Sequence, residues 1–194
     1  MEQFNKLCAL LLISAATTFG STNSALANDQ DVWSTTVPAS SCEPANETDA
    51  NKVKIANGAW VFSGDNLGVV TLYCPLAINA FTVANFSHDN DITAYRVYYR
   101  DTDGGTYGSN GAPTNLAQVT ARLTYRKEDG MYSAGSLWSS HFTPINLRGN
   151  TKIVKNNVHD VQANALYSFI VTLQRLHPSQ SPAFSGIDFP FPGQ

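Results

Sequence analysis

The sequence predicts an all-β protein, an antiparallel β-sandwich of the jelly-roll or immunoglobulin-like kind with about nine strands. Three observations lead to this fold class. Short segments in which apolar and polar residues alternate follow one another along the chain, and turn residues separate them. Aromatic residues make up 11% of the 194 residues, and such side chains pack well on pleated surfaces. No segment has the pattern of a good helix.

Residues 1–27 are interpreted as a secretory signal peptide. Lys6 supplies a basic start, residues 7–16 supply an apolar run, and residues 25–27 (Ala-Leu-Ala) supply a cleavage site. The run is too short to span a bilayer, which needs about 20 apolar residues, and no later segment approaches that length. The mature chain is therefore expected to begin near Asn28, to have no membrane span, and to be secreted into the periplasm or the extracellular space.

The mature chain is expected to divide into an arm and a sandwich domain. Residues 28–52 are predicted to form an irregular N-terminal arm, with a short strand at 32–37 that Pro38 ends or confines to a sheet edge. The arm has few large apolar side chains, so it buries too little surface to offset the entropy of ordering itself. Residues 53–194 are predicted to form the sandwich, because they hold the other alternating segments.

The strands of the sandwich follow from the alternation. The predicted strands are residues 59–62, 68–74, 81–86, 92–100, 118–127, 139–142, 152–155, 166–176 and 183–189. The clearest of them are 92–100 and 118–127. Tyr95, Val97 and Tyr99 share one face of the first segment, and Val119, Ala121, Leu123 and Tyr125 share one face of the second. Leu116, Val119 and Leu123 also fit a helical stripe, so a helix is the alternative for the second of these segments.

Removal of residues 1–27 leaves two cysteines, Cys42 and Cys74. In an oxidising compartment such a pair is expected to form one disulfide. A metal site would need more thiolates or nearby histidines, and a catalytic cysteine would be unpaired. The crosslink constrains the unfolded chain and so stabilises the fold by about 3.5–4 kcal/mol in the chain-entropy model.

The polar faces of segments 92–100 and 118–127 are rich in arginine. The residues on these faces include Arg96, Tyr98, Arg100, Arg122 and Arg126. If the two segments pair with each other, the four arginines stand on one solvated face. That face is interpreted either as an ordinary solvated surface or as a contact for an anionic polymer such as an acidic polysaccharide.

Aromatic side chains are candidate sugar contacts, because their faces stack on the apolar faces of pyranose rings. The candidates are Trp33, Trp60, Trp138, Tyr98, Tyr107 and Tyr132. Trp60 lies next to Val61 and Phe62 in a predicted strand, so it is assigned to the core. Trp138 and Tyr107 have polar, glycine- and serine-rich surroundings, and they are expected to be exposed.

The segment 101–105 is a candidate calcium turn. Asp101 and Asp103 precede two glycines, and hard oxygen ligands on a turning backbone suit calcium. The spacing lacks the EF-hand pattern and its closing glutamate, and Asp-Gly pairs form turns without any ion. No metal site and no cofactor is predicted, and calcium at this turn is left as an open alternative.

Signatures of catalysis and of nucleic-acid binding are weak. The four histidines form no His-Glu-x-x-His motif, no Gly-x-Ser-x-Gly elbow occurs, and the glutamates are not placed as a glycosidase pair. The net charge is −3, whereas neutralising phosphates needs clustered positive charge. The protein is therefore expected to be neither an enzyme nor a nucleic-acid-binding protein.

Residues 37–44 (VPASSCEP), 70–76 (VTLYCPL) and 166–175 (LYSFIVTLQR) resemble a family of secreted bacterial β-sandwich proteins. Its members have a signal peptide, a V-P-A-S-x-C-x-P opening and a second cysteine followed by proline. The resemblance covers the ends of the chain and the cysteine pair well, and the middle poorly. It implies a secreted bacterial β-sandwich with a Cys42–Cys74 bridge, and it brings no catalytic residues.

Together these observations predict an exported, non-enzymatic protein, a surface or extracellular-matrix component that acts through contacts with other proteins or with copies of itself. A strand of a neighbouring chain can complete an exposed sheet edge, and residues 28–52 are the expected donor. The alternative is a carbohydrate-binding, lectin-like module that uses the arginine face or the exposed aromatic residues.

Overall fold

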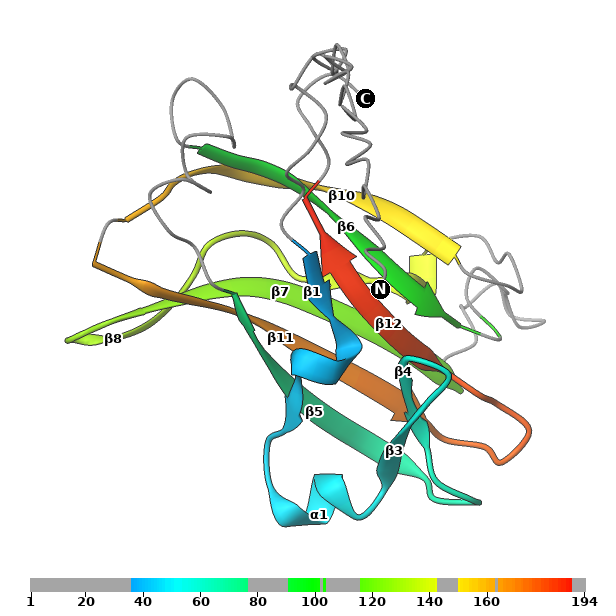
Figure 1. Cartoon of the computed structure of the whole chain (residues 1–194). Helices are drawn as coiled ribbons and strands as arrows, with labels where there is room; N and C mark the ends of the chain where they lie inside the picture. Colours follow the sequence, from blue (N-terminus) through cyan, green and yellow to red (C-terminus); the bar gives the residue numbers. More distant parts are fainter. Residues whose placement is uncertain are drawn as a thin grey trace, which may run out of the picture. The chain divides into compact units, whose positions relative to one another are not determined.

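Two six-stranded antiparallel sheets pack their apolar faces against each other as a sandwich (Figure 1). The structure is a computed structural model that describes residues 36–76, 91–101, 103, 116–142, 150–162 and 164–189. All of these residues belong to the unit Asp31–Gln194. The predicted fold class, an antiparallel β-sandwich with one disulfide, is confirmed.

The first sheet has the strand order β10–β6–β12–β4–β3, and β1 also pairs with β12. Its strands are β1 (Thr36–Pro38), β3 (Val53–Ala56), β4 (Ala59–Phe62), β6 (Asp91–Arg100), β10 (Asn150–Asp160) and β12 (Ala183–Asp188). Strands β4 and β1 pair with successive parts of β12, at residues 183–184 and 186–188. On its other side β12 pairs with β6, so β12 lies inside the sheet.

The second sheet has the order β2–β5–β11–β7–β8, and β9 also pairs with β7. Its strands are β2 (Glu43–Pro44), β5 (Gly68–Leu76), β7 (Ala117–Lys127), β8 (Gly130–Ser133), β9 (Trp138–Ser139) and β11 (Leu166–Arg175). Strand β11 is central and pairs along its whole length with β7. Every second side chain of β11 is buried, which is the alternation that the sequence predicted for this segment.

The core lies between the two sheets. From the first sheet, Tyr95 reaches across to the ring of Phe169 in the second, with centroids 4.9 Å apart. Its hydroxyl donates a hydrogen bond to the carbonyl of Ala121, 3.2 Å away, and burial raises the pKa of this phenol. Strands β6 and β7 therefore lie in different sheets and turn their apolar faces toward each other.

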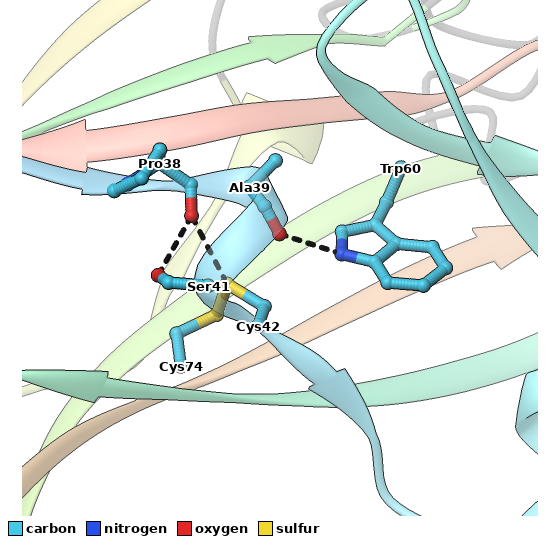
Figure 2. The surroundings of a disulfide bond; sticks show 6 residues. All are labelled: Pro38, Ala39, Ser41, Cys42, Trp60 and Cys74. Atoms are coloured by element: carbon cyan, nitrogen blue, oxygen red, sulfur yellow. Dashed lines mark hydrogen bonds between the residues drawn. A yellow bond between two sulfur atoms is a disulfide. The ribbon is translucent and has the colours of Figure 1, made fainter.

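The segment around the disulfide is part of the sandwich (Figure 2). Val37 and Ala39 are buried, and Cys42 is bonded to Cys74 of β5. A 3-10 turn, η1 (Ala39–Ser41), follows β1, and Trp60 Nε1 donates a 2.8 Å hydrogen bond to the Ala39 carbonyl within it. Strand β1 pairs with β12 of its own chain. This corrects the prediction that the N-terminal arm donates a strand to a neighbouring chain.

Several predicted elements differ from the observed ones. The described residues contain β2, β3 and β8, which the sequence did not indicate. Most side chains of these short strands are exposed or half-buried, so the strands lack the apolar alternation that a buried face leaves. They also contain one helical turn, α1 (Glu47–Ala50), capped by the Asn46 side chain. The helical alternative near Leu116 is wrong, because β7 begins at Ala117. Segment 139–142 is strand only at β9 and continues as a 3-10 turn, η2 (Ser140–Phe142).

Three predictions fall partly or wholly outside the described residues. These are the signal peptide at 1–27, the first part of the arm, and the strand at 81–86. Within the ranges that are described, no helix has the length and apolar character needed to cross a membrane.

Candidate functional site

The predicted arginine face does not exist as one surface. Arg96 and Arg100 lie on β6 in the first sheet, whereas Arg122 and Arg126 lie on β7 in the second. Strand β6 pairs with β10 and β12, and β7 pairs with β11, β8 and β9. Because the apolar faces of the two sheets meet in the core, the arginines stand on outer faces that point in opposite directions. The prediction failed because it assumed that consecutive strands pair with each other.

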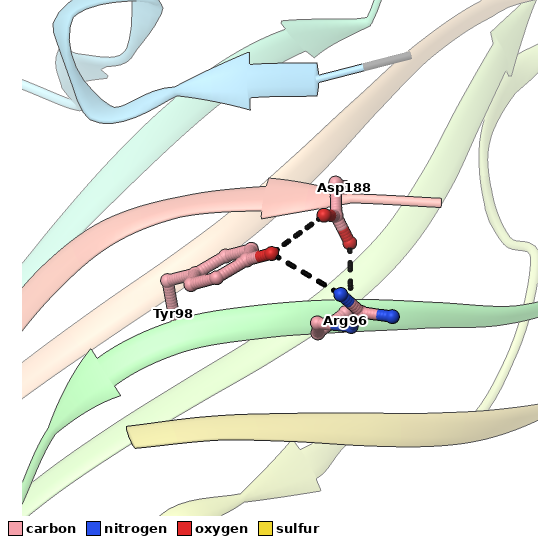
Figure 3. A network of polar contacts seen from close by, with 3 residues as sticks. All are labelled: Arg96, Tyr98 and Asp188. Atoms are coloured by element: carbon pink, nitrogen blue, oxygen red, sulfur yellow. Dashed lines mark hydrogen bonds and ion pairs between the residues drawn. The ribbon is translucent and has the colours of Figure 1, made fainter. Parts of the chain in front are cut away.

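Arg96 and Tyr98 form a polar network with Asp188 on the outer face of the first sheet (Figure 3). The Tyr98 hydroxyl donates a 2.7 Å hydrogen bond to Asp188 Oδ2, and this bond raises the pKa of the phenol. Arg96 donates to the same hydroxyl at 3.4 Å, and its Nε lies 3.8 Å from Asp188 Oδ1. The charge of Arg96 is therefore balanced within the chain, and this network joins β6 to β12.

Trp138 is a core residue, so its predicted exposure is wrong. Its side chain is 9% exposed and meets the ring of Tyr99 edge-on, with centroids 4.9 Å apart. Strand β9 pairs with β7 in the register Ala121 to Trp138, which places Trp138 on the inner face of the second sheet. Trp60 packs half-buried against the core, as expected. Trp33 and Tyr107 lie outside the described residues.

The two aspartates of the candidate calcium turn bind protein groups instead. Both are buried. The Asp103 carboxylate accepts hydrogen bonds from the backbone N–H groups of Leu116 and Ala117, at 2.9 Å each, and so holds the start of β7. Asp101 accepts from Ser140 Oγ and from the Asp103 N–H, while burial raises its pKa. Among the described residues no group of acidic, histidine or cysteine side chains suits a metal ion.

A cluster of three tyrosines, which we call the tyrosine cluster, lies where β7, β8 and β11 meet. Tyr125 and Tyr132 face each other across the β7–β8 hairpin, and their rings stack with centroids 5.3 Å apart and an interplanar angle of 24°. Tyr125 also stacks on Tyr167 of β11, at 5.7 Å and 28°. The cluster thus forms a row from the buried Tyr167 through the half-buried Tyr125 to Tyr132, which is 39% exposed.

Hydrogen bonds hold both ends of this row. The Tyr132 hydroxyl donates to Asp129 Oδ2 at 2.7 Å, which raises the pKa of the phenol. The Tyr167 hydroxyl accepts from the Gln162 N–H at 2.9 Å and lies 2.8 Å from His159 Nε2. Partial burial lowers the pKa of His159, which favours the neutral imidazole.

A surface hollow of about 480 Å³, the polar hollow, adjoins the tyrosine cluster. The described residues that line it are Lys127, Glu128, Asp129, Gln162 and Asn164. Two of them contact the cluster: Asp129 through the Tyr132 hydroxyl, and Lys127, whose Nζ lies 5.6 Å from the centroid of the Tyr125 ring. Lys127 Nζ also donates a 3.1 Å hydrogen bond to Gln162 Oε1, which links the hairpin to the segment before β11.

The sequence contained only part of this site. Tyr132 was among the aromatic candidates, whereas Tyr125 and Gln162 were not singled out as site residues. The available signal was the pair of tyrosines placed symmetrically about the turn at Glu128 and Asp129, which a hairpin brings face to face. Tyr167 and Gln162 required knowledge of which strand pairs with β7.

No protein-family model and no curated protein matches the chain. Solved structures with similar strand arrangements were found. One is the family 61 carbohydrate-binding module TmCBM61 in complex with beta-1,4-galactotriose, with TM-score 0.35 and 10% identity over 80% of this chain and 84% of that one. Another is a family 29 carbohydrate-binding module from Piromyces equi, with TM-score 0.35 and 10% identity; the match covers 80% of this chain and 89% of that one. A third is a family two carbohydrate esterase from Cellvibrio japonicus, with TM-score 0.36 and 8% identity; the match covers 82% of this chain and 33% of that one.

These findings correct the main functional prediction. Most of the similar structures are carbohydrate-binding modules. The predicted surface or matrix component that acts through protein–protein contacts is therefore not retained.

Proposed function

We propose that the protein is a non-enzymatic carbohydrate-binding module that holds a neutral sugar ring against Tyr132, beside the polar hollow. One observation carries the proposal: an exposed tyrosine ring, stacked from behind on Tyr125, stands next to a hollow lined by carboxylate, amide and ammonium groups. A pyranose has an apolar face that stacks on an aromatic ring, and its hydroxyls need hydrogen-bond donors and acceptors at the ring's edge.

The polar hollow offers both kinds of group. Glu128 and Asp129 accept hydrogen bonds, Lys127 donates them, and the side-chain amides of Gln162 and Asn164 do both. A sugar hydroxyl likewise donates one hydrogen bond and accepts others, so it can pair with any of these side chains. The positive charge of Lys127 is matched by the two neighbouring carboxylates, which favours an uncharged ligand over an anionic one.

The ring of Tyr132 is held in place before any ligand arrives. Tyr125 supports one face, and Asp129 fixes the hydroxyl. Tyr125 is itself supported by Tyr167, whose hydroxyl is fixed by the Gln162 N–H and by His159. A rigid platform loses little conformational entropy on binding, so more of the stacking energy appears as affinity.

We further propose that the protein acts outside the cytoplasm. The apolar run at residues 7–16 and the Cys42–Cys74 disulfide support export to an oxidising compartment. Polysaccharides are abundant there, and the solved structures with similar strand arrangements include carbohydrate-binding modules. The proposal of sugar binding itself rests on the tyrosine cluster and the polar hollow of this chain.

The test is affinity electrophoresis through gels that contain single neutral polysaccharides, such as galactan, glucomannan and non-crystalline cellulose. We expect the wild-type protein to be retarded by at least one of them, and Tyr132→Ala to lose that retardation. The matched control is Tyr73→Ala, because Tyr73 is a comparably exposed tyrosine, 43% against 39%, on the outer face of β5. Equal retardation of Tyr132→Ala and wild type, or equal losses in both variants, would overturn the proposed site.

A further inference from the structure

A second hollow, of about 600 Å³, lies at the other end of β11 from the tyrosine cluster. We call it the arginine hollow, because Arg100 of β6 and Arg175 of β11 line it. Tyr167 near the start of β11 pairs with Tyr125, and Arg175 at its end pairs with Ala117. The two positions are eight residue steps apart along an extended strand, about 26 Å, so the two hollows are separate sites.

The arginine hollow carries two cations and no carboxylate among its described lining residues. Neither arginine has an ion pair within the part of the chain that the structure describes. This differs from Arg96, whose charge Asp188 balances on the same sheet. The hollow is therefore positively charged, and none of these lining residues would repel an anionic group placed in it.

Arg175 is buried without a counter-ion. Its side chain is 7% exposed, and its two terminal nitrogens donate to the carbonyls of Gly64, at 2.6 Å, and of Pro178. Its Nε is buried and has no hydrogen-bond partner among the described residues. Carbonyl oxygens accept the protons of a guanidinium but do not neutralise its charge, and a buried unbalanced charge is unfavourable. An anion in the hollow would reduce this cost.

Arg100 supplies the group that an anion can reach. Its Nε donates a 2.7 Å hydrogen bond to the Ser181 carbonyl, which fixes the plane of the guanidinium. Its terminal nitrogens have no partner among the described residues, and the side chain is half-buried. Two N–H groups of these terminal nitrogens can donate to the two oxygens of one carboxylate. Such bidentate pairs are stronger than single hydrogen bonds between neutral groups.

The remaining walls fit a ring that bears the carboxylate. Val61, Phe62 and Pro182 give apolar surface, while Asn57 and Ser185 give side chains that can bond to hydroxyls. A hollow of this volume is larger than a carboxylate alone would fill. We propose that the arginine hollow binds a hexuronic acid residue, with its carboxylate on Arg100 and its charge balanced also by Arg175. The inference does not depend on the tyrosine cluster.

The test compares D-glucuronate with D-glucose by isothermal titration calorimetry or by NMR titration at low salt. The two sugars have the same ring and differ in the carboxylate, so we expect glucuronate to bind at least about tenfold more tightly. Arg100→Gln should remove that difference while the fold is kept. Arg122→Gln is the matched control, because Arg122 is a half-buried arginine on the outer face of the other sheet.

The outcomes are distinct. Equal affinities for the two sugars, or full glucuronate binding by Arg100→Gln, would overturn the inference. Glucuronate binding that survives in Tyr132→Ala supports it and shows that the arginine hollow is independent of the tyrosine cluster. Loss of glucuronate binding in Arg122→Gln to the same extent as in Arg100→Gln would show that any surface arginine, and not the hollow, accounts for the binding, and would overturn the inference.

Discussion

The rings of Tyr125 and Tyr132 stack across the β7–β8 hairpin with centroids 5.3 Å apart. The two residues are direct partners in the strand register, so the hairpin itself aligns the rings. The turn between the strands carries Glu128 and Asp129, and Asp129 binds the Tyr132 hydroxyl. One short hairpin therefore supplies both the aromatic platform and part of the polar hollow beside it.

Tyr132→Phe separates the ring from its hydroxyl. The variant keeps the stacking surface and loses only the hydrogen bond to Asp129. We therefore expect its affinity for a retained neutral polysaccharide to stay within about threefold of wild type, whereas Tyr132→Ala weakens binding by about tenfold or more. Dissociation constants from calorimetry with soluble oligosaccharides check this order. A Phe variant as weak as the Ala variant would show that the hydroxyl, and not the ring face, makes the contact.

Acidification should weaken the folded state through His159. Partial burial lowers the pKa of this imidazole in the folded protein, with nearby Lys127 acting in the same direction and Asp160 opposing it. The unfolded chain therefore takes up a proton first, at a pKa near 6.5. The stability that the neutral His159 contributes is therefore fully present above pH 6.5. It is lost as the pH falls through the lower pKa that His159 has in the folded protein.

Chemical unfolding followed by fluorescence between pH 7.5 and pH 5 measures this effect. The free energy of unfolding should fall with pH, and His159→Gln should flatten the profile. His177→Gln is the control, because His177 is exposed and its imidazole forms hydrogen bonds with Ser179 of its own loop. A profile with the same slope in wild type and His159→Gln would contradict the assignment.

The docking of β1 requires glycine at position 186. A Cβ atom there would lie 2.8 Å from the Val37 carbonyl oxygen, and the backbone φ is +146°. Gly186→Ala should therefore lower the free energy of unfolding by about 2–4 kcal/mol, from steric overlap and from the backbone together. Gly58→Ala, at φ +77° with no atom near the added Cβ, isolates the backbone part and should cost about 1–2 kcal/mol. Equal losses in the two variants would contradict a tight β1–β12 contact.

The disulfide should contribute measurably to stability. Replacing both Cys42 and Cys74 by alanine removes the crosslink without leaving a buried thiol, and we expect the free energy of unfolding to fall by about 2–5 kcal/mol. The intact mass of the purified native protein should also be lower than that of the reduced protein by the mass of two hydrogen atoms. Detection of two free thiols in native material would contradict the bridge.

The alternating segments could be predicted from the sequence because burial of one face leaves a period-2 pattern that needs no knowledge of the partner strand. Segments 92–100 and 118–127 were placed with their apolar faces inward, and Val97 and Leu123 are fully buried. The same pattern does not say which strand lies beside which. The arginine face was assembled from two segments that are consecutive in the chain, and the structure places them in different sheets.

The sites depend on contacts between residues far apart in the chain. Tyr167 reaches Tyr125 only because β11 pairs with β7, and Arg100 and Arg175 come to one hollow from different sheets. Trp138 was misplaced because its neighbours in sequence are polar, whereas its environment is set by Tyr99 and the register of β9. Local composition predicts exposure only where the strand's neighbours are known.

The central claim, that a sugar ring stacks on Tyr132, is tested most directly by NMR of protein labelled with ¹³C in the tyrosine rings. The neutral oligosaccharide that binds most tightly would be titrated into the wild-type protein, with the ring signals assigned through Tyr132→Phe, Tyr125→Phe and Tyr73→Phe. The account predicts saturable shifts of the Tyr132 ring signals, smaller shifts at Tyr125 behind it, and none at Tyr73. Binding that saturates while the Tyr132 signals stay unchanged would contradict it.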